Sequence, residues 1–297
     1  MIQYARYGTV SAITVAVIWG LSFVAARMVL STLSPVLLAT VRFSIASAIF
    51  APIIILEFRR GNAPTPHDLM ELALLGFLSI SIYFWLQYTG VKYAGAGVSA
   101  LLVVGLIPIL TGFASTVVLK ERFSAQKMLG TVLGLSGVAL IALPGLFLGE
   151  VDWLFYLGVV CLLLNSVCWA VYSTLSRHIL NRIRRPSMVT AYVTILGTLA
   201  LVPMSLASDW NLVKSLQPEQ WLSILYLSLV CSCLDYFLWN FALSRVEAVR
   251  AAVWLYLEPV AAFIGETVIF SIIPHATTLI GGGLIITGAL LTTRSRE

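Results

Sequence analysis

The sequence consists largely of long apolar blocks, each about as long as the 20 or so residues that cross a bilayer as a helix. Ten such blocks can be counted, and the connections between them are short. Only 10% of the residues are charged, whereas a soluble domain carries about 25%. The sequence therefore predicts an all-α integral membrane protein, with spans near residues 8–30, 35–56, 69–91, 96–119, 126–147, 153–175, 187–207, 219–243, 251–272 and 277–293.

The basic residues are distributed unequally between the two sides of this arrangement. With a cytoplasmic N-terminus, 14 of the 18 Lys and Arg residues fall on the cytoplasmic side, two on the other side, and Arg27 and Arg42 within helices. Such an excess marks cytoplasmic loops. Both termini are therefore predicted to be cytoplasmic. The net charge of +5 comes from residues between helices, so it indicates no nucleic-acid partner.

The first block and the cysteines each have a second interpretation. Only Arg6 precedes the first block and no cleavage site follows it, so we expect a retained helix and not a signal peptide. The four cysteines lie in apolar segments and are interpreted as small buried residues. Since Cys231 and Cys233 point in different directions on a helix, they do not form a metal motif. We expect no metal and no cofactor.

The second half of the chain repeats the first. Shifting residues 78–92 by 153 positions places Tyr83 on Tyr236 and Gln87 on Asn240. Trp19 falls on Trp169 at an offset of 150, and Pro108 falls on Pro259 at an offset of 151. The chain is therefore predicted to contain two five-helix repeats, residues 1–148 and 149–297, within one membrane domain.

An odd number of spans in each repeat has a geometric consequence. The second repeat must enter the membrane from the opposite side, so a pseudo-two-fold axis in the membrane plane relates the two halves. Inverted repeats of this kind build alternating-access carriers, whose substrate site lies near the midplane between the halves. We therefore expect a central cavity there.

Polar and aromatic residues recur at helical spacing in both repeats, as in Ser79, Tyr83 and Gln87. Polar groups are costly in hydrocarbon unless they meet a partner or water. They can line the cavity or hydrogen-bond neighbouring helices, and their occurrence in both halves favours the cavity. The predicted substrate-binding residues are Trp19, Ser22, Ser79, Tyr83, Gln87, Asn165, Trp169, Tyr172, Ser232, Tyr236, Asn240 and Trp254.

Proline and glycine residues mark further positions inside the spans. Pro108 and Pro259 lie mid-span, where each removes a backbone hydrogen bond, and they form either hinges or static kinks. The glycines at 130, 134, 137, 281–283 and 288 have the spacing of close helix contacts, within one protomer or between two. We expect a monomer or a weak homodimer.

Few ionisable residues lie inside the predicted spans, and each is a functional candidate by default. Arg42 can also snorkel or pair with a carboxylate, Asp235 can pack beside Trp239, and Glu266 can reach an interface. Glu258 precedes Pro259, and its counterpart in the first half is Ile107. A group present in only one half suits directional coupling, so Glu258 is either a proton site or a structural hydrogen-bond partner. The predicted coupling or gating residues are Glu258, Pro108, Pro259 and Arg42.

At these residues the chain resembles EamA-type proteins of the drug/metabolite transporter superfamily. The motifs that carry the resemblance are Trp19-Gly20-x-Ser22-Phe23, Pro35 with Arg42, Glu121-Arg122-Phe123-Ser124 before Gly130, and Leu257-Glu258-Pro259-Val260. The resemblance implies ten helices, a bacterial-type inner (plasma) membrane and export of small metabolites, with amino-acid exporters the most similar group. One departure is visible, because Ile272-Ile273-Pro274 offers no acid to match Glu121.

The residue types also limit the solute. Aromatic faces suit flat apolar side chains or cations, and Ser, Gln and Asn can bond amino or carboxylate groups. A phosphorylated solute needs several Lys or Arg, which the spans lack. We therefore predict export of neutral, in particular aromatic, amino acids by alternating access. An uncoupled facilitator and a drug exporter of the same fold remain alternatives.

An enzyme is the remote alternative. Gly134-Leu135-Ser136-Gly137 matches the motif of an intramembrane serine protease, which needs a histidine within hydrogen-bond reach. The three histidines, His67, His178 and His275, all lie in loops or at helix ends. The sequence contains no metalloprotease motif or phosphate loop. It therefore predicts a transporter and not an enzyme.

Overall fold

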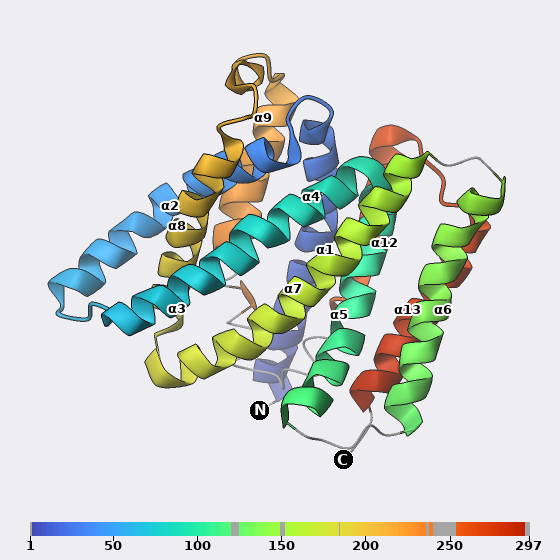
Figure 1. Ribbon diagram of the computed structural model, residues 1–297, viewed down its shortest axis with the longest axis horizontal. Helices are drawn as coiled ribbons and strands as arrows, with labels where there is room; N and C mark the ends of the chain where they lie inside the picture. The colour runs from blue at the N-terminus through green and yellow to red at the C-terminus, as the bar shows by residue number, and fades with distance from the viewer. Residues whose placement is uncertain are drawn as a thin grey trace.

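The computed structural model describes residues 2–119, 125–148, 152–183, 185–235, 238–239 and 254–294, and these residues form helices with no β-strand (Figure 1). The elements in chain order are α1 (Ile2–Leu30), α2 (Pro35–Arg59), α3 (Pro66–Gly76), the π-helix η1 (Phe77–Ile82), α4 (Tyr83–Ala94), α5 (Ala96–Leu119), α6 (Ala125–Leu148), α7 (Trp153–Ile183), α8 (Pro186–Ser205), the 3-10 helix η2 (Trp210–Val213), α9 (Pro218–Leu225), the π-helix η3 (Tyr226–Leu234), α12 (Leu257–Phe270) and α13 (Ala276–Arg294).

These elements agree with the predicted spans. The segments α3, η1 and α4 follow one another without a break and form one span, and α9 with η3 begins another. In the described part of the chain, each of the ten predicted blocks contains a helix. Five helical segments there are long and apolar enough to cross a membrane, and three further apolar helical segments are shorter.

The outer faces of the helices are apolar, as expected of side chains that meet lipid. On α7, large apolar side chains that are 38–51% exposed recur every three or four residues. This spacing places them in one stripe along the helix. Hydrocarbon can cover such a stripe, whereas water cannot do so cheaply. The stripe consists of Leu157, Val160, Leu164, Val167, Val171 and Leu175.

Local sequence signals explain where two of the helices begin. Ser34 caps α2 by accepting a hydrogen bond from the Leu37 backbone N–H at 3.3 Å. Thr65 and Asp68 form a capping box at the start of α3. Both helices have proline in the first turn, where its missing N–H removes no helical bond. These two caps therefore determine where the α1–α2 loop and the α2–α3 loop end.

Helix packing follows the pattern expected of an inverted repeat. The α1 helix packs on α12 and η3, while α7, its counterpart in the second half, packs on α5 and α4. Exchanging the two halves therefore maps one set of contacts onto the other. Two further large contacts, α2 with α8 and α6 with α13, join helices that the same exchange maps onto each other. The contact of α13 with α5 departs from this symmetry, because α6 and α12, their counterparts, do not form a comparable contact in the described part of the chain.

Glycines allow α6 and α13 to approach closely, and Figure 1 shows these two helices side by side. A Cβ atom at Gly137 would lie 2.4 Å from the Gly281 carbonyl oxygen. A Cβ atom at Gly288 would lie 2.4 Å from the carbonyl oxygen of Gly130. The predicted close helix contact is thus confirmed, and it lies within one chain.

The two prolines occupy different positions. Pro108 lies inside α5, as predicted. The mid-helix prediction is wrong for Pro259, because it is the third residue of α12 and follows a turn at Leu255–Tyr256. The Leu255 carbonyl accepts a hydrogen bond from the Glu258 backbone N–H at 2.9 Å. The break in this span therefore precedes Pro259, and the proline leaves the Leu255 carbonyl satisfied.

Candidate functional site

Arg42 of α2 is a buried cation with partners on two other helices, and 5% of it is exposed. Its Nε donates a hydrogen bond to Ser232 Oγ at 3.1 Å, and its Nη1 donates to Tyr88 Oη at 2.5 Å. Its guanidinium lies 4.9 Å from the Phe43 ring centroid and 4.7 Å from that of Phe84. Since these ring faces attract a cation, Arg42 is held by its partners and does not snorkel.

Four aromatic rings continue from Arg42 towards α7. The ring of Phe84 lies 4.9 Å from that of Tyr83, and Tyr83 lies 5.2 Å from Trp169. Trp169 in turn lies 5.4 Å from Tyr172. We call Tyr83, Phe84, Trp169 and Tyr172 the aromatic cluster. It brings together three of the predicted substrate-binding residues, and Arg42 lies at one end of it.

A second group of aromatic residues also joins the two halves. The rings of Trp19 and Trp239 lie 5.8 Å apart, and Trp239 and Trp254 both pack on Ala12. Trp19 and Trp169 are repeat counterparts, so each half presents a tryptophan to a partner helix. The predicted site residues Tyr236 and Asn240 lie outside the described residues.

Two of the predicted serines bond within their own helices. The Ser79 hydroxyl donates to the Leu75 carbonyl at 2.7 Å, and the Ser22 hydroxyl donates to the Trp19 carbonyl at 2.6 Å. Their hydroxyl groups therefore need no solute. Ser232 differs, because it accepts from Arg42 while it donates to the Leu227 carbonyl at 3.0 Å. Gln87 is buried, with 8% exposed.

Asn165 of α7 is fully buried and joins that helix to α4. Its Nδ2 donates a hydrogen bond to the Tyr83 carbonyl at 2.8 Å. Its Oδ1 has no hydrogen-bond partner among the residues that the structure describes. Asn165 therefore positions Tyr83 and leaves one acceptor at the aromatic cluster.

Both repeats contain a π-helix at corresponding positions, which the sequence did not reveal. An offset of 153 moves η1 onto residues 230–235, which overlap η3. Within η1, the Ser81 hydroxyl donates to the Gly197 carbonyl of α8 at 2.8 Å. The η3 segment carries Ser232 and ends immediately before Asp235. π-helical turns frequently occur at functional sites, and here they flank Arg42 and the aromatic cluster.

Two buried carboxylates lie near one another, and one of them, Asp235, also lies near Arg42. Asp235 is fully buried, and neither of its side-chain oxygens has a hydrogen-bond partner in the described part of the chain. Glu258 is 5% exposed. Asp235 is close enough to Arg42 and to Glu258 for their charges to interact. The sequence signal for Asp235 was its place three residues after Ser232, on the same helix face.

Glu266 of α12 connects three helices, and we call its contacts with Arg27, Ala96 and Gly97 the Glu266 clasp. Its carboxylate pairs with Arg27 of α1 and accepts the backbone N–H groups of Ala96 at 3.0 Å and Gly97 at 2.9 Å. Those N–H groups belong to the first turn of α5, where a negative charge is favourable. Gly95 precedes them with a φ of 88°, a conformation that favours glycine. Glu266 is therefore held by contacts between helices.

A second group of ion pairs lies at the far end of α2. Arg185 donates to Glu57 at 2.5 Å, and Arg182 pairs with Asp68 at 2.6 Å and with Glu71. The bond from Arg185 holds the pKa of the Glu57 carboxyl below its usual value. The Thr65 hydroxyl does the same for the pKa of Asp68. These pairs connect α2 and α3 of the first half with α7 and α8 of the second.

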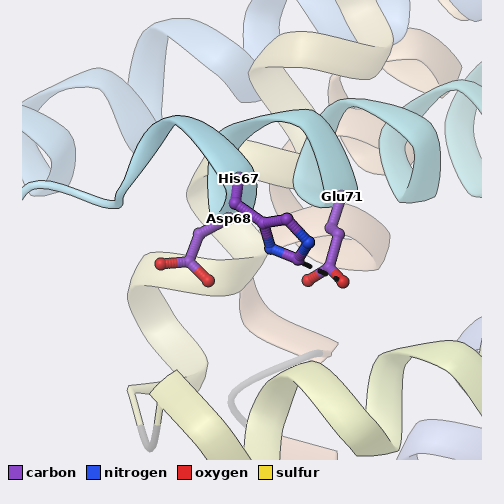
Figure 2. Close-up of side chains that lie close together, drawn as sticks. All are labelled: His67, Asp68 and Glu71. Atoms are coloured by element: carbon purple, nitrogen blue, oxygen red, sulfur yellow. Dashed lines mark ion pairs between the residues drawn. The ribbon is translucent and has the colours of Figure 1, made fainter.

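Three side chains in this region have ligand atoms within 4.8 Å of one another, namely His67, Asp68 and Glu71 (Figure 2). His67 Nδ1 lies 3.9 Å from a Glu71 oxygen. Arg182 already neutralises both carboxylates, and the bond with Glu71 raises the pKa of Arg182. A cation would have to compete with this guanidinium, so the group is an ion-pair cluster.

The comparison with known proteins agrees with the helix packing. A model of the EamA-like transporter family matches residues 6–143 and matches again over residues 156–294. The chain belongs to this family. The resemblance found in the sequence is thereby confirmed, and the two matches correspond to an internal repeat of the transporter fold.

Several transporters are similar to this EamA-family chain along nearly its whole length. An uncharacterized transporter of Archaeoglobus fulgidus is 29% identical over 284 residues, which cover 94% of this chain and 95% of that protein. A probable terminal-alkyne amino-acid exporter of Streptantibioticus cattleyicolor is 28% identical over 282 residues, covering 94% and 90%. One crystal structure has the same fold, with a TM-score of 0.62 and 21% sequence identity. The match covers 96% of this chain and 95% of the chain in that crystal structure.

The chain is therefore a membrane-embedded transporter, and the names of its family and relatives indicate transport and not enzymatic chemistry. The serine of the protease-like motif agrees with this conclusion. The Ser136 hydroxyl donates to the Val132 carbonyl at 2.8 Å, on an exposed face of α6. The glycines around it pack against α13.

Proposed function

We propose that this transporter exports neutral amino acids with bulky or aromatic side chains. The observation that supports the substrate class is the placement of Arg42 at one end of the aromatic cluster, stacked on Phe84. A guanidinium can bind a carboxylate, and aromatic faces accept a flat apolar side chain. The similar probable amino-acid exporter of Streptantibioticus cattleyicolor adds weaker support.

The buried charges also argue against other solutes. A phosphorylated solute calls for several Lys or Arg, whereas the ion pairs at the far end of α2 lie away from the aromatic cluster. Asn165 contributes an acceptor next to Tyr83, to which a solute can donate a hydrogen bond. One cation, an aromatic wall and a few neutral polar groups fit an amino acid better than a sugar phosphate.

We propose that transport proceeds by alternating access, between halves comprising residues 1–148 and 149–297. With both termini in the cytoplasm of a bacterial-type cell, the Glu266 clasp lies at the outer end of the protein and the Arg182 and Arg185 pairs lie at the cytoplasmic end. Opening to either side then requires one of these two sets of contacts to separate. The turn at Leu255–Tyr256 is a natural position for bending, since it divides its span.

The experiment that tests the substrate class is efflux from proteoliposomes loaded with labelled phenylalanine, leucine, threonine or glutamate. The proposal predicts faster efflux of phenylalanine and leucine than of glutamate. The Tyr83→Ala and Trp169→Ala variants should slow phenylalanine efflux, whereas Trp210→Ala, outside the cluster, should not. Equal leakage of all four amino acids from protein-containing and empty vesicles would disprove the substrate class.

Coupling to protons is the second part of this proposal. Glu258 is buried in the first turn of α12 and interacts with the charge of Asp235, so a proton on either acid changes the field at Arg42. An inward proton gradient should therefore drive phenylalanine efflux against its concentration gradient. An unchanged rate would favour the uncoupled facilitator.

A further inference from the structure

Asp235 is a buried acid to which the described helices offer no hydrogen-bond donor. It is fully buried, and both side-chain oxygens lack a partner among the described residues. A carboxylate in such a position is costly, because it has lost its water without gaining hydrogen bonds in return. The other buried side-chain atoms without partners in the described part of the chain are Asn165 Oδ1 and Tyr156 Oη.

The groups around Asp235 do not satisfy it. Arg42 faces it from α2, but the Nε and Nη1 of that guanidinium donate to Ser232 and Tyr88. Tyr226 interacts with its charge from η3, but the Tyr226 hydroxyl donates to the Ile18 carbonyl at 2.7 Å. In the described part of the chain, the remaining titratable neighbours are the Cys231 thiol of η3 and Glu258 of α12.

The group that would satisfy Asp235 is therefore a hydrogen-bond donor that carries a positive charge. Asp235 interacts with the charges of both Arg42 and Glu258, so the net charge of these three groups is negative when both acids are ionised. An ammonium group has three N–H donors and a full positive charge. Hydrogen bonds between ionised partners are about twice as strong as those between neutral groups.

We propose that Asp235 binds the ammonium group of the amino-acid substrate while Arg42 binds its carboxylate. This inference rests on the proposed function and adds a residue that recognises the amine. Because Arg42 stacks on Phe84 at one end of the aromatic cluster, the substrate side chain extends from the two charges towards Tyr83 and Trp169. The site then distinguishes an amino acid from a carboxylic acid of the same shape.

The test compares phenylalanine with 3-phenylpropanoate, which lacks the amine, and with phenethylamine, which lacks the carboxylate. Equilibrium binding of labelled phenylalanine to the purified protein, with the other two compounds as competitors, gives the three affinities. We expect Asp235→Asn to weaken phenylalanine and phenethylamine binding about 10- to 100-fold. The affinity for 3-phenylpropanoate should stay within about threefold. Asp235→Glu should restore part of the preference, because it keeps the charge.

Two controls separate recognition from folding. Glu219→Gln, at an exposed acid in the first turn of α9, should change none of the three affinities. Thermal unfolding of Asp235→Asn should show a Tm no lower than that of the wild type, because the variant removes a buried charge that has no hydrogen bonds.

The possible outcomes separate this inference from the proposed function. If the wild type binds no amino acid, the proposed function fails. If the wild type prefers phenylalanine and Asp235→Asn keeps the same preference over 3-phenylpropanoate, the inference alone fails. It also fails if Asp235→Asn abolishes only the pH dependence of binding, since Asp235 would then hold a proton and no ammonium group.

Discussion

Replacing Glu266 with glutamine tests the clasp between α1, α5 and α12. The carboxylate accepts two backbone N–H groups from the first turn of α5 and pairs with Arg27. Glutamine has nearly the same shape, but its amide offers one oxygen and places an NH₂ group where the second oxygen was. One of the N–H groups of Ala96 and Gly97 then loses its acceptor.

The size of the effect follows from these contacts. A buried donor without a partner costs about 1–3 kcal/mol, and a bond to a neutral acceptor is weaker than one to a carboxylate. The side chain of Arg27 is 29% exposed, so the loss of its partner is partly offset by water and adds about 0.5–1 kcal/mol. The total is about 3 kcal/mol, which lowers the Tm by roughly 6–12 °C.

Thermal unfolding of the detergent-purified protein, followed by intrinsic tryptophan fluorescence, measures this shift. Glu219→Gln is the matched control, because it removes an exposed acid from the first turn of α9, and its Tm should stay within about 2 °C of the wild type. Combining Glu266→Gln with Arg27→Met should cost less than the two single changes added together, since both remove one interaction. A Tm for Glu266→Gln equal to that of the control would refute the clasp.

The other predictions concern packing, pH and the aromatic cluster. Gly137→Leu should separate α6 from α13 and lower the Tm by several degrees more than Val132→Leu on the exposed face of α6, in the same unfolding assay. Because Glu57 and Asp68 have lowered pKa values, their stabilisation is present above the unfolded value of about 4 and lost as the pH falls through the folded values. Circular-dichroism melts should therefore show no loss from these pairs between pH 8 and 5, and a loss below about pH 4. Trp169→Phe should retain more phenylalanine efflux than Trp169→Ala, because an aromatic face remains, and equal rates would contradict the role of the ring.

The sequence predicted the fold well because the signals that define it are periodic. Apolar blocks of the right length identify spans without any knowledge of their contacts, and the matched positions of Trp19 and Trp169 identified the repeat. The glycine spacing at residues 130–137 predicted a close helix contact, which the structure places between α6 and α13. These features depend on local sequence, so one chain contains all the necessary information.

The partners of the polar groups were harder to predict, because they depend on which helices meet. Ser79 has the spacing of a cavity residue, yet its hydroxyl bonds to a carbonyl of its own helix. Glu266 seemed to be one isolated acid, and its role appears only when Arg27 and the start of α5 are placed beside it. The π-helices could not be predicted from a single sequence. Each π-helical hydrogen bond spans one residue more than an α-helical one, which changes the bonding pattern and not the residue types.

Phenylalanine efflux from proteoliposomes, compared with glutamate efflux under the same conditions, is the decisive measurement of whether this protein exports bulky neutral amino acids. Preformed vesicles containing the wild-type protein, the Tyr83→Ala variant or no protein provide the comparison. We expect the wild type to release phenylalanine faster than glutamate, and Tyr83→Ala to reduce this release while its insertion in the membrane is unchanged. Release of phenylalanine at the rate of empty vesicles, by a correctly folded wild type, would contradict it.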